Sequence, residues 1–328
     1  MPWVAPDVID DINKAVGRRW QGLDPLLPEP VTLPPGCMAP LVANERNGRP
    51  AGLGICHHES VPDDTLAQTW GTATRFTLTL RVREPGTQAA DELLTQWRDH
   101  LAELPEAAAE DTSAVVNWPT RDVGGVLPLL RHGLQPMAVI AGRPKGRPTP
   151  AEGAGTAPDL VIRQAAPDDI DIVTELEMSV VGYDAHFGGS IPRPGTEALV
   201  RAEARTALRY VPTWIWIAER GGEPVGVTIV EPPEDAAWVA GMTRPGSTAY
   251  LRIGFVSPDQ RGGGIGAALI KHVHNALDAR GIEVTLLHYA QVNPLSGPFW
   301  SRMGYRPLWT SWEARPAARG GPAMTPAT

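Results

Sequence analysis

Residues 255–270 read Phe255-Val256-Ser257-Pro258-Asp259-Gln260-Arg261-Gly262-Gly263-Gly264-Ile265-Gly266-Ala267-Ala268-Leu269-Ile270. The pattern predicts a strand that ends at Val256, a glycine-rich turn, and a helix over 264–279 with apolar residues at helical spacing. Successive glycines permit positive φ and let backbone N–H groups converge at the helix start. Such a helix N-terminus binds anions such as a pyrophosphate, and Arg261 adds a fixed positive charge. The stretch therefore predicts a phosphate-binding loop.

Two common phosphate-binding loops fit this stretch poorly. A Walker loop requires Gly-Lys-Ser/Thr, which does not follow the glycines. A dinucleotide fingerprint is matched by Gly262, Gly264 and Ala267, but it needs an acidic residue at the end of the next strand to bind the ribose. That strand, expected over Ile282–Tyr289, ends in His288-Tyr289. A purely structural glycine-rich turn is a further alternative.

A third loop type is Arg-x-x-Gly-x-Gly, matched by Arg261, Gly264 and Gly266. It resembles the signature of the GNAT family of acyl-CoA-dependent N-acyltransferases. From Leu160 to Trp312 we expect a strand, two helices, three strands, a helix, a strand, a short helix and a final strand, which is also this family's order. The resemblance implies an α/β fold with a mixed, mostly antiparallel sheet flanked by helices. It also implies acetyl-CoA as co-substrate, no metal, and acetyl transfer to a primary amine.

The family's second signature is an Asn followed by a short helix that ends before Gly-aromatic. Here it reads Asn293-Pro294-Leu295-Ser296-Gly297-Pro298-Phe299-Trp300-Ser301-Arg302-Met303-Gly304-Tyr305. The resemblance implies that Asn293 hydrogen-bonds the pantetheine arm, and that the backbone at the end of strand 250–256 pairs with pantetheine amides like an added strand. The coenzyme-binding residues that it implies are Phe255, Val256, Arg261, Gly262, Gly263, Gly264, Ile265, Gly266, Asn293, Phe299 and Trp300.

Internal similarity predicts a tandem duplication. Residues 43–52 resemble residues 217–226 at an offset of 174, and residues 131–136 resemble residues 302–307 at an offset of 171. These similarities flank a Pro- and Gly-rich segment, 142–159, which is typical of a linker. The alternative is two common hairpin and helix-end patterns. We expect a degenerate GNAT-like domain at 1–145, a linker at 146–158, an active GNAT N-acetyltransferase domain at 159–315 and a disordered tail at 316–328.

The first half lacks the features expected of a coenzyme site. After its strand Phe76–Val82, the loop Arg83–Gln88 is shorter than the second copy's loop and nearly without glycine. Asp122 stands in the place of Asn293, and Leu129 in the place of Trp300. An acid beside a pyrophosphate or a pantetheine carbonyl would repel it, so we expect the first half to bind no coenzyme.

Two positions depart from the family's catalytic pattern. Many members carry a Tyr acid seven residues after the Asn, where this chain has Trp300, whose indole N–H is not a practical acid and whose bulk suits packing. Histone-type members carry a Glu base where this chain has Tyr250. By resemblance, the backbone N–H of Phe255 or Val256 is the donor to the thioester carbonyl. We expect Tyr250 and His288 to orient a water that takes the amine proton, with His288 as the better base because its reference pKa of about 6.5 lies near working pH.

The acceptor is expected at the opposite end of the site. Counting back by twos from Val256 places Gly254, Arg252 and Tyr250 on one face of the strand. A cationic Arg252 there favours an acceptor with an acidic group near its amine, unless Arg252 is paired with an acid of the protein. The segment Tyr183–Gly189 is either an acceptor lid, in which Tyr183 and His186 bind the acceptor, or a helix end with a turn.

Composition narrows the remaining possibilities. The net charge of −8 argues against nucleic acid or an anionic membrane as partner, and no stretch approaches the roughly 18 apolar residues of a membrane helix. Two cysteines, Cys37 and Cys56, make no disulfide framework, so we expect a cytoplasmic protein. In Cys56-His57-His58-Glu59, neighbouring side chains on a strand point to opposite faces, which disfavours a metal site. A non-catalytic acyl-CoA-binding or regulatory protein is the alternative function. The acceptor's identity and the oligomeric state stay open.

Overall fold

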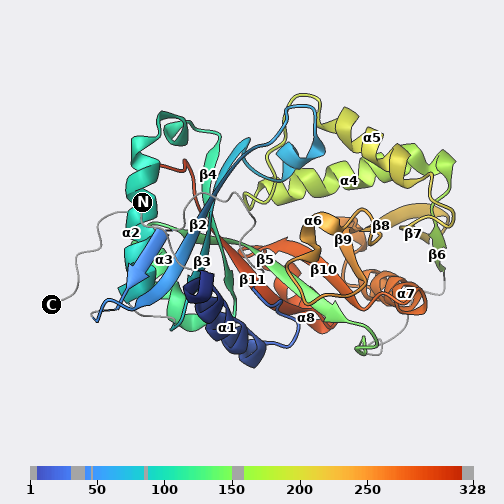
Figure 1. The fold of residues 1–328 in the computed structure, drawn as a ribbon. Coiled ribbons are helices and arrows are strands. Elements are labelled where there is room, and N and C mark those ends of the chain that lie inside the picture. The colour runs from blue at the N-terminus through green and yellow to red at the C-terminus, as the bar shows by residue number, and fades with distance from the viewer. Residues whose placement is uncertain (1–5, 31–40, 46, 85–87, 150–158, 320–328) are drawn as a thin grey trace. The chain divides into compact units, whose positions relative to one another are not determined.

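The computed structural model describes all residues except 1–5, 31–40, 46, 85–87, 150–158 and 320–328 (Figure 1). The chain forms two compact units. Unit 1 comprises Met1–Asp63, Thr72–Val139 and Pro307–Thr328, and unit 2 comprises Asp64–Gly71 and Ile140–Arg306. Each unit therefore includes a segment from the other half of the sequence. A division of the chain at the Pro- and Gly-rich segment alone does not account for this exchange.

Unit 1 is built on five strands in the order β1-β2-β3-β4-β11. Its neighbouring strands are antiparallel except β3 and β4, which are parallel. Its elements are α1 (Pro6–Leu23), β1 (Leu41–Asn44), β2 (Pro50–Ser60), β3 (Thr74–Val82), α2 (Gln88–Glu103), β4 (Thr112–Pro119), α3 (Val126–Arg131), the first part of β5 (Gln135–Pro144), and β11 (Arg306–Ala314).

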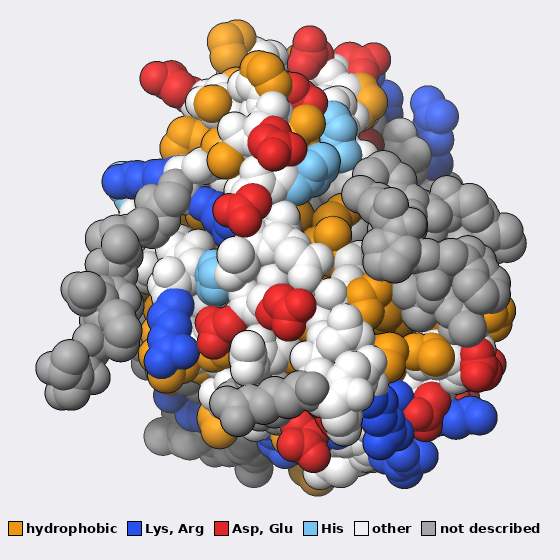
Figure 2. Space-filling view, turned by 60° about the vertical axis from the view of Figure 1, so that its left-hand side comes forward, with side chains coloured by type: hydrophobic (Ala, Val, Ile, Leu, Met, Phe, Trp, Pro, Cys, Tyr) orange, Lys and Arg blue, Asp and Glu red, His pale blue; other side chains and the backbone are white. Residues whose placement is uncertain are grey.

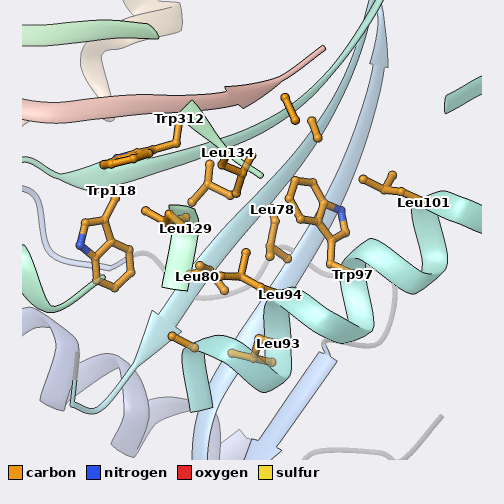
Figure 3. Close-up of a cluster of buried hydrophobic side chains, with 14 of the residues drawn as sticks. Leu78, Leu80, Leu93, Leu94, Trp97, Leu101, Trp118, Leu129, Leu134 and Trp312 are labelled. Atoms are coloured by element: carbon orange, nitrogen blue, oxygen red, sulfur yellow. The ribbon is translucent and has the colours of Figure 1, made fainter. Parts of the chain in front are cut away.

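The core of unit 1 lies between its sheet and α2 (Figure 3). Leu93, Trp97 and Leu101 recur every four residues along α2, so they share one face, and all three are buried. They pack with side chains from β3, β4, α3, the turn after α3, and β11, which include Leu78, Leu80, Trp118, Leu129, Leu134 and Trp312. The last strand of the chain thus completes the hydrophobic core of the first unit.

Unit 2 contains the sheet order β5-β10-β9-β8-β7-β6. Strands β9 and β10 are parallel, whereas the pairs β6–β7, β7–β8 and β8–β9 are antiparallel. Its elements are β6 (Leu160–Gln164), α4 (Ile170–Ala185), α5 (Thr196–Ala207), β7 (Ile215–Arg220), β8 (Glu223–Glu231), α6 (Ala237–Ala240), β9 (Thr248–Val256), α7 (Ile265–Ala279), β10 (Val284–Ala290) and α8 (Ser296–Arg302).

Helices α4 and α5 cover one face of the unit 2 sheet, and α7 lies on the other (Figure 1). Buried residues of α4 and α5 pack against alternate residues of β7 and β8, among them Ile215, Ile217, Val227 and Ile229. The segment Asp64–Gly71 braces the connection between the two helices, because the Ile191 N–H donates to the Thr69 carbonyl at 2.7 Å.

The predicted duplication and fold class are confirmed. The run β1, β2, β3, α2, β4, α3, β5 has the same order as β7, β8, β9, α7, β10, α8, β11. In both runs an antiparallel hairpin leads to a third strand that is parallel to the fourth. The turns at Gly133 and Gly304, which the two copies share, have φ of 76° and 90°. The expected domain limits stay a prediction, since the two units exchange segments.

The end of the chain departs from expectation. We expected a disordered tail from Pro316, yet Ala317 is fully buried in unit 1, and its N–H donates to Thr112 Oγ1 at 3.0 Å. Residues 320–328 of that tail and most of the predicted linker lie outside the described residues. Acidic and basic side chains both occur across the face in Figure 2. In the described part of the chain, no helix is long and apolar enough to cross a membrane.

Candidate active site

The glycine-rich loop has the backbone geometry that its sequence predicts. β9 ends at Val256, Gly262 and Gly264 have φ of 86° and 79°, and α7 begins at Ile265. Within the described structure the backbone N–H groups of residues 262–267 have no hydrogen-bond acceptor. A row of free donors at a helix N-terminus is the arrangement that binds phosphate groups. The residues present therefore fit the pyrophosphate of coenzyme A.

Strands β9 and β10 diverge next to this loop. Their parallel pairing covers only Thr248–Tyr250 and Val284–Leu286, so the rest of β9 has no partner on that edge. A cavity of about 450 Å³ lies beside the divergence and is lined from β9, β10, α4, α7 and α8. An open strand edge beside an anion-binding loop suits a ligand with a phosphate head and an amide-containing arm.

Most of the predicted coenzyme residues line this cavity. They are Phe255, Val256, Arg261, Gly262, Gly264, Ile265, Gly266, Asn293, Phe299 and Trp300. Gly263 is in the same loop but does not line the cavity. The structure thus brings together two signatures that lie about thirty residues apart in the sequence. Their contact with a coenzyme stays a prediction.

Asn293 combines a structural role with a free donor. Its Oδ1 accepts hydrogen bonds from the N–H groups of Leu295 at 3.0 Å and Ser296 at 3.4 Å, which caps the start of α8. Its Nδ2 has no partner among the described residues, and the side chain lines the cavity. The side chain can therefore cap α8 and donate to a carbonyl of the ligand at once.

Trp300 is a packing residue of the cavity wall. It is buried, and its ring lies at the edge of Phe299 and of Tyr305. A Cβ atom on Gly254 would lie 2.9 Å from the Trp300 ring, so only glycine permits this approach of α8 to β9. This contact supports the packing interpretation of Trp300.

Arg261 makes local contacts in this structure. Its Nε donates to the Val256 carbonyl at 2.9 Å, and its guanidinium lies 5.0 Å from the centre of the Tyr183 ring. The Val256 carbonyl is one of the backbone groups that the resemblance assigns to pantetheine. Arg261 and the expected ligand therefore use the same stretch of strand edge.

Tyr250 and His288, the predicted catalytic pair, contact one another. His288 Nδ1 and the Tyr250 hydroxyl are 3.1 Å apart, and the Trp238 ring stacks on His288. His288 lines the cavity, and Tyr250 is buried behind it. Burial lowers the pKa of His288 to about 4 and raises that of Tyr250, so both are neutral at pH 7. The reason for preferring His288 as the base, a pKa near 6.5, therefore does not hold, and the catalytic role of the pair stays a prediction.

Arg252 is not the free cation that the anionic-acceptor hypothesis requires. Its Nη1 lies 2.5 Å from Oε1 of Glu177, which is 0% exposed, and its Nε lies 3.6 Å from Glu231. The prediction that Arg252 and Gly254 lie on the same face of β9 is also wrong. Where the register shifts between Ile229 and Val230 of β8, β9 has one extra residue, Arg252, and the alternation of faces is interrupted there. As a result Arg252 reaches α4, whereas Gly254 packs under Trp300.

The end of α4 supplies a carboxylate that sequence reasoning passed over. Tyr183 and Asp184 line the cavity, but His186 is exposed and does not. Asp184 has no side-chain hydrogen bond or ion pair with any described residue, and burial raises its pKa to about 6. The sequence signal was present, since Asp184 lies in the predicted lid segment, but its burial could not be read from the sequence.

The corresponding place in unit 1 is filled by a side chain of the protein. β3 and β4 pair only over Thr74–Thr77 and Thr112–Val115 and then diverge. Arg19 of α1 donates there to the carbonyls of Val82 and Arg83, and its Nε lies 3.0 Å from Asp122 Oδ2. Asp122 precedes α3 along the chain, as Asn293 precedes α8.

The fold of unit 2 is that of a GNAT acetyltransferase domain. Residues 212–307 match the family model described as Acetyltransferase (GNAT) domain. The crystal structure of a GCN5-related N-acetyltransferase from Sphaerobacter thermophilus shares the fold over 98% of this chain and 97% of its own, with 14% identity and a TM-score of 0.56. The chain therefore contains a GNAT acetyltransferase domain and has a tandem GNAT form.

Two other solved structures have lower TM-scores. A tandem GNAT protein from the clavulanic acid biosynthesis pathway is 18% identical over 94% of this chain and 97% of its own, with a TM-score of 0.43. The aminoglycoside N-acetyltransferase AAC(6')-Iy in complex with CoA is 18% identical over 45% of this chain and 89% of its own, with a TM-score of 0.37. No curated protein matches the chain.

Proposed function

We propose that unit 2 transfers an acetyl group from acetyl-CoA to a primary amine, and that unit 1 binds no coenzyme. The observation that carries this proposal is the cavity where β9 and β10 diverge, with the free N–H groups of the glycine-rich loop at one end. Unit 1 has the same strand divergence, but Arg19 fills it.

Each residue of the site has a defined task in this reaction. The N–H groups of residues 262–267 hold the pyrophosphate, and Asn293 Nδ2 donates to a pantetheine carbonyl. Trp300 fixes the wall beside Gly254, so that the acyl end is held against β9. A free backbone N–H of Phe255 or Val256 donates to the thioester oxygen, where negative charge develops during attack by the amine.

The test is release of the CoA thiol from acetyl-CoA across a library of primary amines, with mass spectrometry of each product. We expect thiol release that depends on at least one amine, together with an acetylated product. Calorimetry should give one coenzyme site per chain. Two equivalent sites would contradict the assignment of binding to unit 2 alone.

A non-catalytic acyl-CoA-binding protein is the second candidate. It is favoured by Trp300, which stands where many family members carry a tyrosine acid and which here packs against Gly254 and Tyr305. Tight coenzyme binding with no amine-dependent thiol release from any library member would support this candidate. Amine-dependent turnover would exclude it.

Replacing Asn293 should separate its two roles. Asn293→Asp keeps an oxygen that caps α8 but removes the Nδ2 donor, whereas Asn293→Ala removes both. We expect both variants to weaken coenzyme binding by roughly 1–3 kcal/mol, the cost of an unpaired buried amide partner. Only Asn293→Ala should also lose about 1 kcal/mol of folding stability.

Calorimetry and thermal unfolding measure these two effects. If Asn293→Asp binds coenzyme as tightly as the wild type, Asn293 is a helix cap and no more.

A further inference from the structure

At the acceptor end of the cavity, carboxylates outnumber guanidinium groups around Arg252. Asp184 of α4 and Arg252 of β9 line this end. Arg252 is already paired with Glu177, and Glu231 lies 3.6 Å from its Nε. A carboxylate or phosphate of an acceptor would therefore compete with two carboxylates of the protein for a single guanidinium.

Asp184 is the carboxylate at this end that has no partner among the described residues. The other titratable side chains that line the cavity are Tyr183 on the same helix, Arg252 on β9, Arg261 in the glycine-rich loop, His288 and Tyr289 on β10, and Arg302 on α8, and Tyr250 contacts His288. Asp184 forms an ion pair with none of the described arginines. His288 and Tyr250 are neutral at pH 7 for the reasons given above, and Arg261 donates to the Val256 carbonyl. Asp184 is thus left to attract a positive charge from outside the protein.

A second polar group in the cavity also lacks a partner. Thr228 of β8 is 0% exposed, lines the cavity, and its hydroxyl makes no hydrogen bond with any described residue. Buried hydroxyl groups in folded proteins nearly always have partners. An unpaired hydroxyl in the wall and an unpaired carboxylate at one end indicate that bound molecules complete this cavity.

We propose that the acceptor is a cationic amine without a carboxylate or phosphate next to its nitrogen, and that Asp184 binds its ammonium group and takes its proton. This inference rests on the proposed function. The Asp184 carboxylate removes one proton from the ammonium group, and the nitrogen lone pair forms the new N–C bond at the thioester carbonyl. The C–S bond then breaks, the thiolate takes the second nitrogen proton, and Asp184 releases its proton to solvent. The products are the amide, the CoA thiol and one proton.

Three amines with the same carbon chain test the substrate class: pentylamine, 1,5-diaminopentane and 2-aminopentanoate. The first and third have the same number of carbon atoms, and the third carries a carboxylate on the carbon that bears the amine. We expect kcat/KM for pentylamine to exceed that for 2-aminopentanoate by about tenfold or more, because the local field repels the added carboxylate. 1,5-Diaminopentane should be at least as good as pentylamine.

Asp184 itself is tested by Asp184→Asn, with Asp171→Asn on the same helix as the matched control. Asp171 is an exposed carboxylate paired with Arg201 at 2.7 Å, outside the cavity. In the wild type, kcat/KM should rise with pH through about 6, as Asp184 loses its proton. Asp184→Asn should remove this rise and lower kcat/KM by about 100-fold or more. Asp184→Glu should restore part of the rate, and Asp171→Asn should behave as the wild type.

Measuring the coenzyme dissociation constant distinguishes a failure of this inference about Asp184 from a failure of the proposed function. This constant should be unchanged in Asp184→Asn, since Asp184 makes no side-chain hydrogen bond or ion pair with any described residue of the loop. Amine-dependent turnover with a preference for 2-aminopentanoate, or an unchanged pH profile in Asp184→Asn, would overturn this inference while the proposed function stands. Coenzyme binding without turnover of any library amine would overturn both.

Discussion

Gly264→Val should raise the coenzyme dissociation constant at least about 100-fold. Gly264 has a φ of 79°, a conformation that costs an L-residue roughly 1–2 kcal/mol and a β-branched one more. A Cβ there would meet nothing within 4 Å, so the effect comes from the backbone and not from crowding. As the loop relaxes, its N–H groups no longer converge. Losing two hydrogen bonds to a charged group, at roughly 1.5–3 kcal/mol each, accounts for that factor.

Gly281→Val is the matched control for this prediction. Gly281 follows the other end of α7, has a φ of 81°, and is equally free of neighbours within 4 Å. The two substitutions should therefore lower folding stability by similar amounts, while only Gly264→Val weakens coenzyme binding. Calorimetry and thermal unfolding provide the two measurements. Equal coenzyme affinities in both variants would show that the glycine-rich loop is a structural turn.

The sequence predicts the coenzyme end of the site because local pattern determines it. A strand, consecutive glycines and an amphipathic helix follow one another within residues 248–279, and the positive φ at Gly262 and Gly264 needs no distant contact. The duplication is visible for the same reason. A hairpin and a helix-end glycine recur in both halves as short local signals, and Gly133 and Gly304 adopt the same backbone conformation.

The acceptor end could not be predicted in the same way, because it depends on long-range contacts. Arg252 is neutralised by Glu177, which lies 75 residues earlier on another element, and a register shift in β8 and β9 breaks the alternation on which its orientation was based. The pKa values of Asp184 and His288 follow from burial, which arises only when α4 and β10 pack around the cavity. Reference pKa values were therefore a poor guide to these two groups.

The second large effect is expected in unit 1, where Arg19→Met should destabilise the protein by about 3–5 kcal/mol. The guanidinium of Arg19 bridges the carbonyls of Val82 and Arg83 to the carboxylate of Asp122, which is 4% exposed. Removing it leaves a buried carboxylate without a cation. Burial already raises the pKa of Asp122 despite the nearby Arg19, which shows how unfavourable this position is for an uncompensated charge.

Two further variants isolate the cause. Arg18→Met changes the neighbouring, exposed arginine on α1 and should alter stability by no more than about 0.5 kcal/mol. The double variant Arg19→Met/Asp122→Asn removes both charges and should recover most of the loss, which denaturant unfolding measures as a coupling energy. A double variant as unstable as the sum of its two single variants would mean that Arg19 acts through its packing and not through Asp122.

The same substitution tests why unit 1 binds no coenzyme. If Arg19 alone blocks an intact site, Arg19→Met should bind two coenzyme molecules per chain. We expect one, because the segment that follows β3 has a single glycine, Gly86, where the second copy has Gly262, Gly263, Gly264 and Gly266, and a sequence so poor in glycine does not favour converging N–H groups. Asp122 would also repel the ligand where Asn293 donates. Calorimetry on Arg19→Met that still gives one site would mean that unit 1 has kept the diverging strands of the family but uses them to anchor its own N-terminal helix.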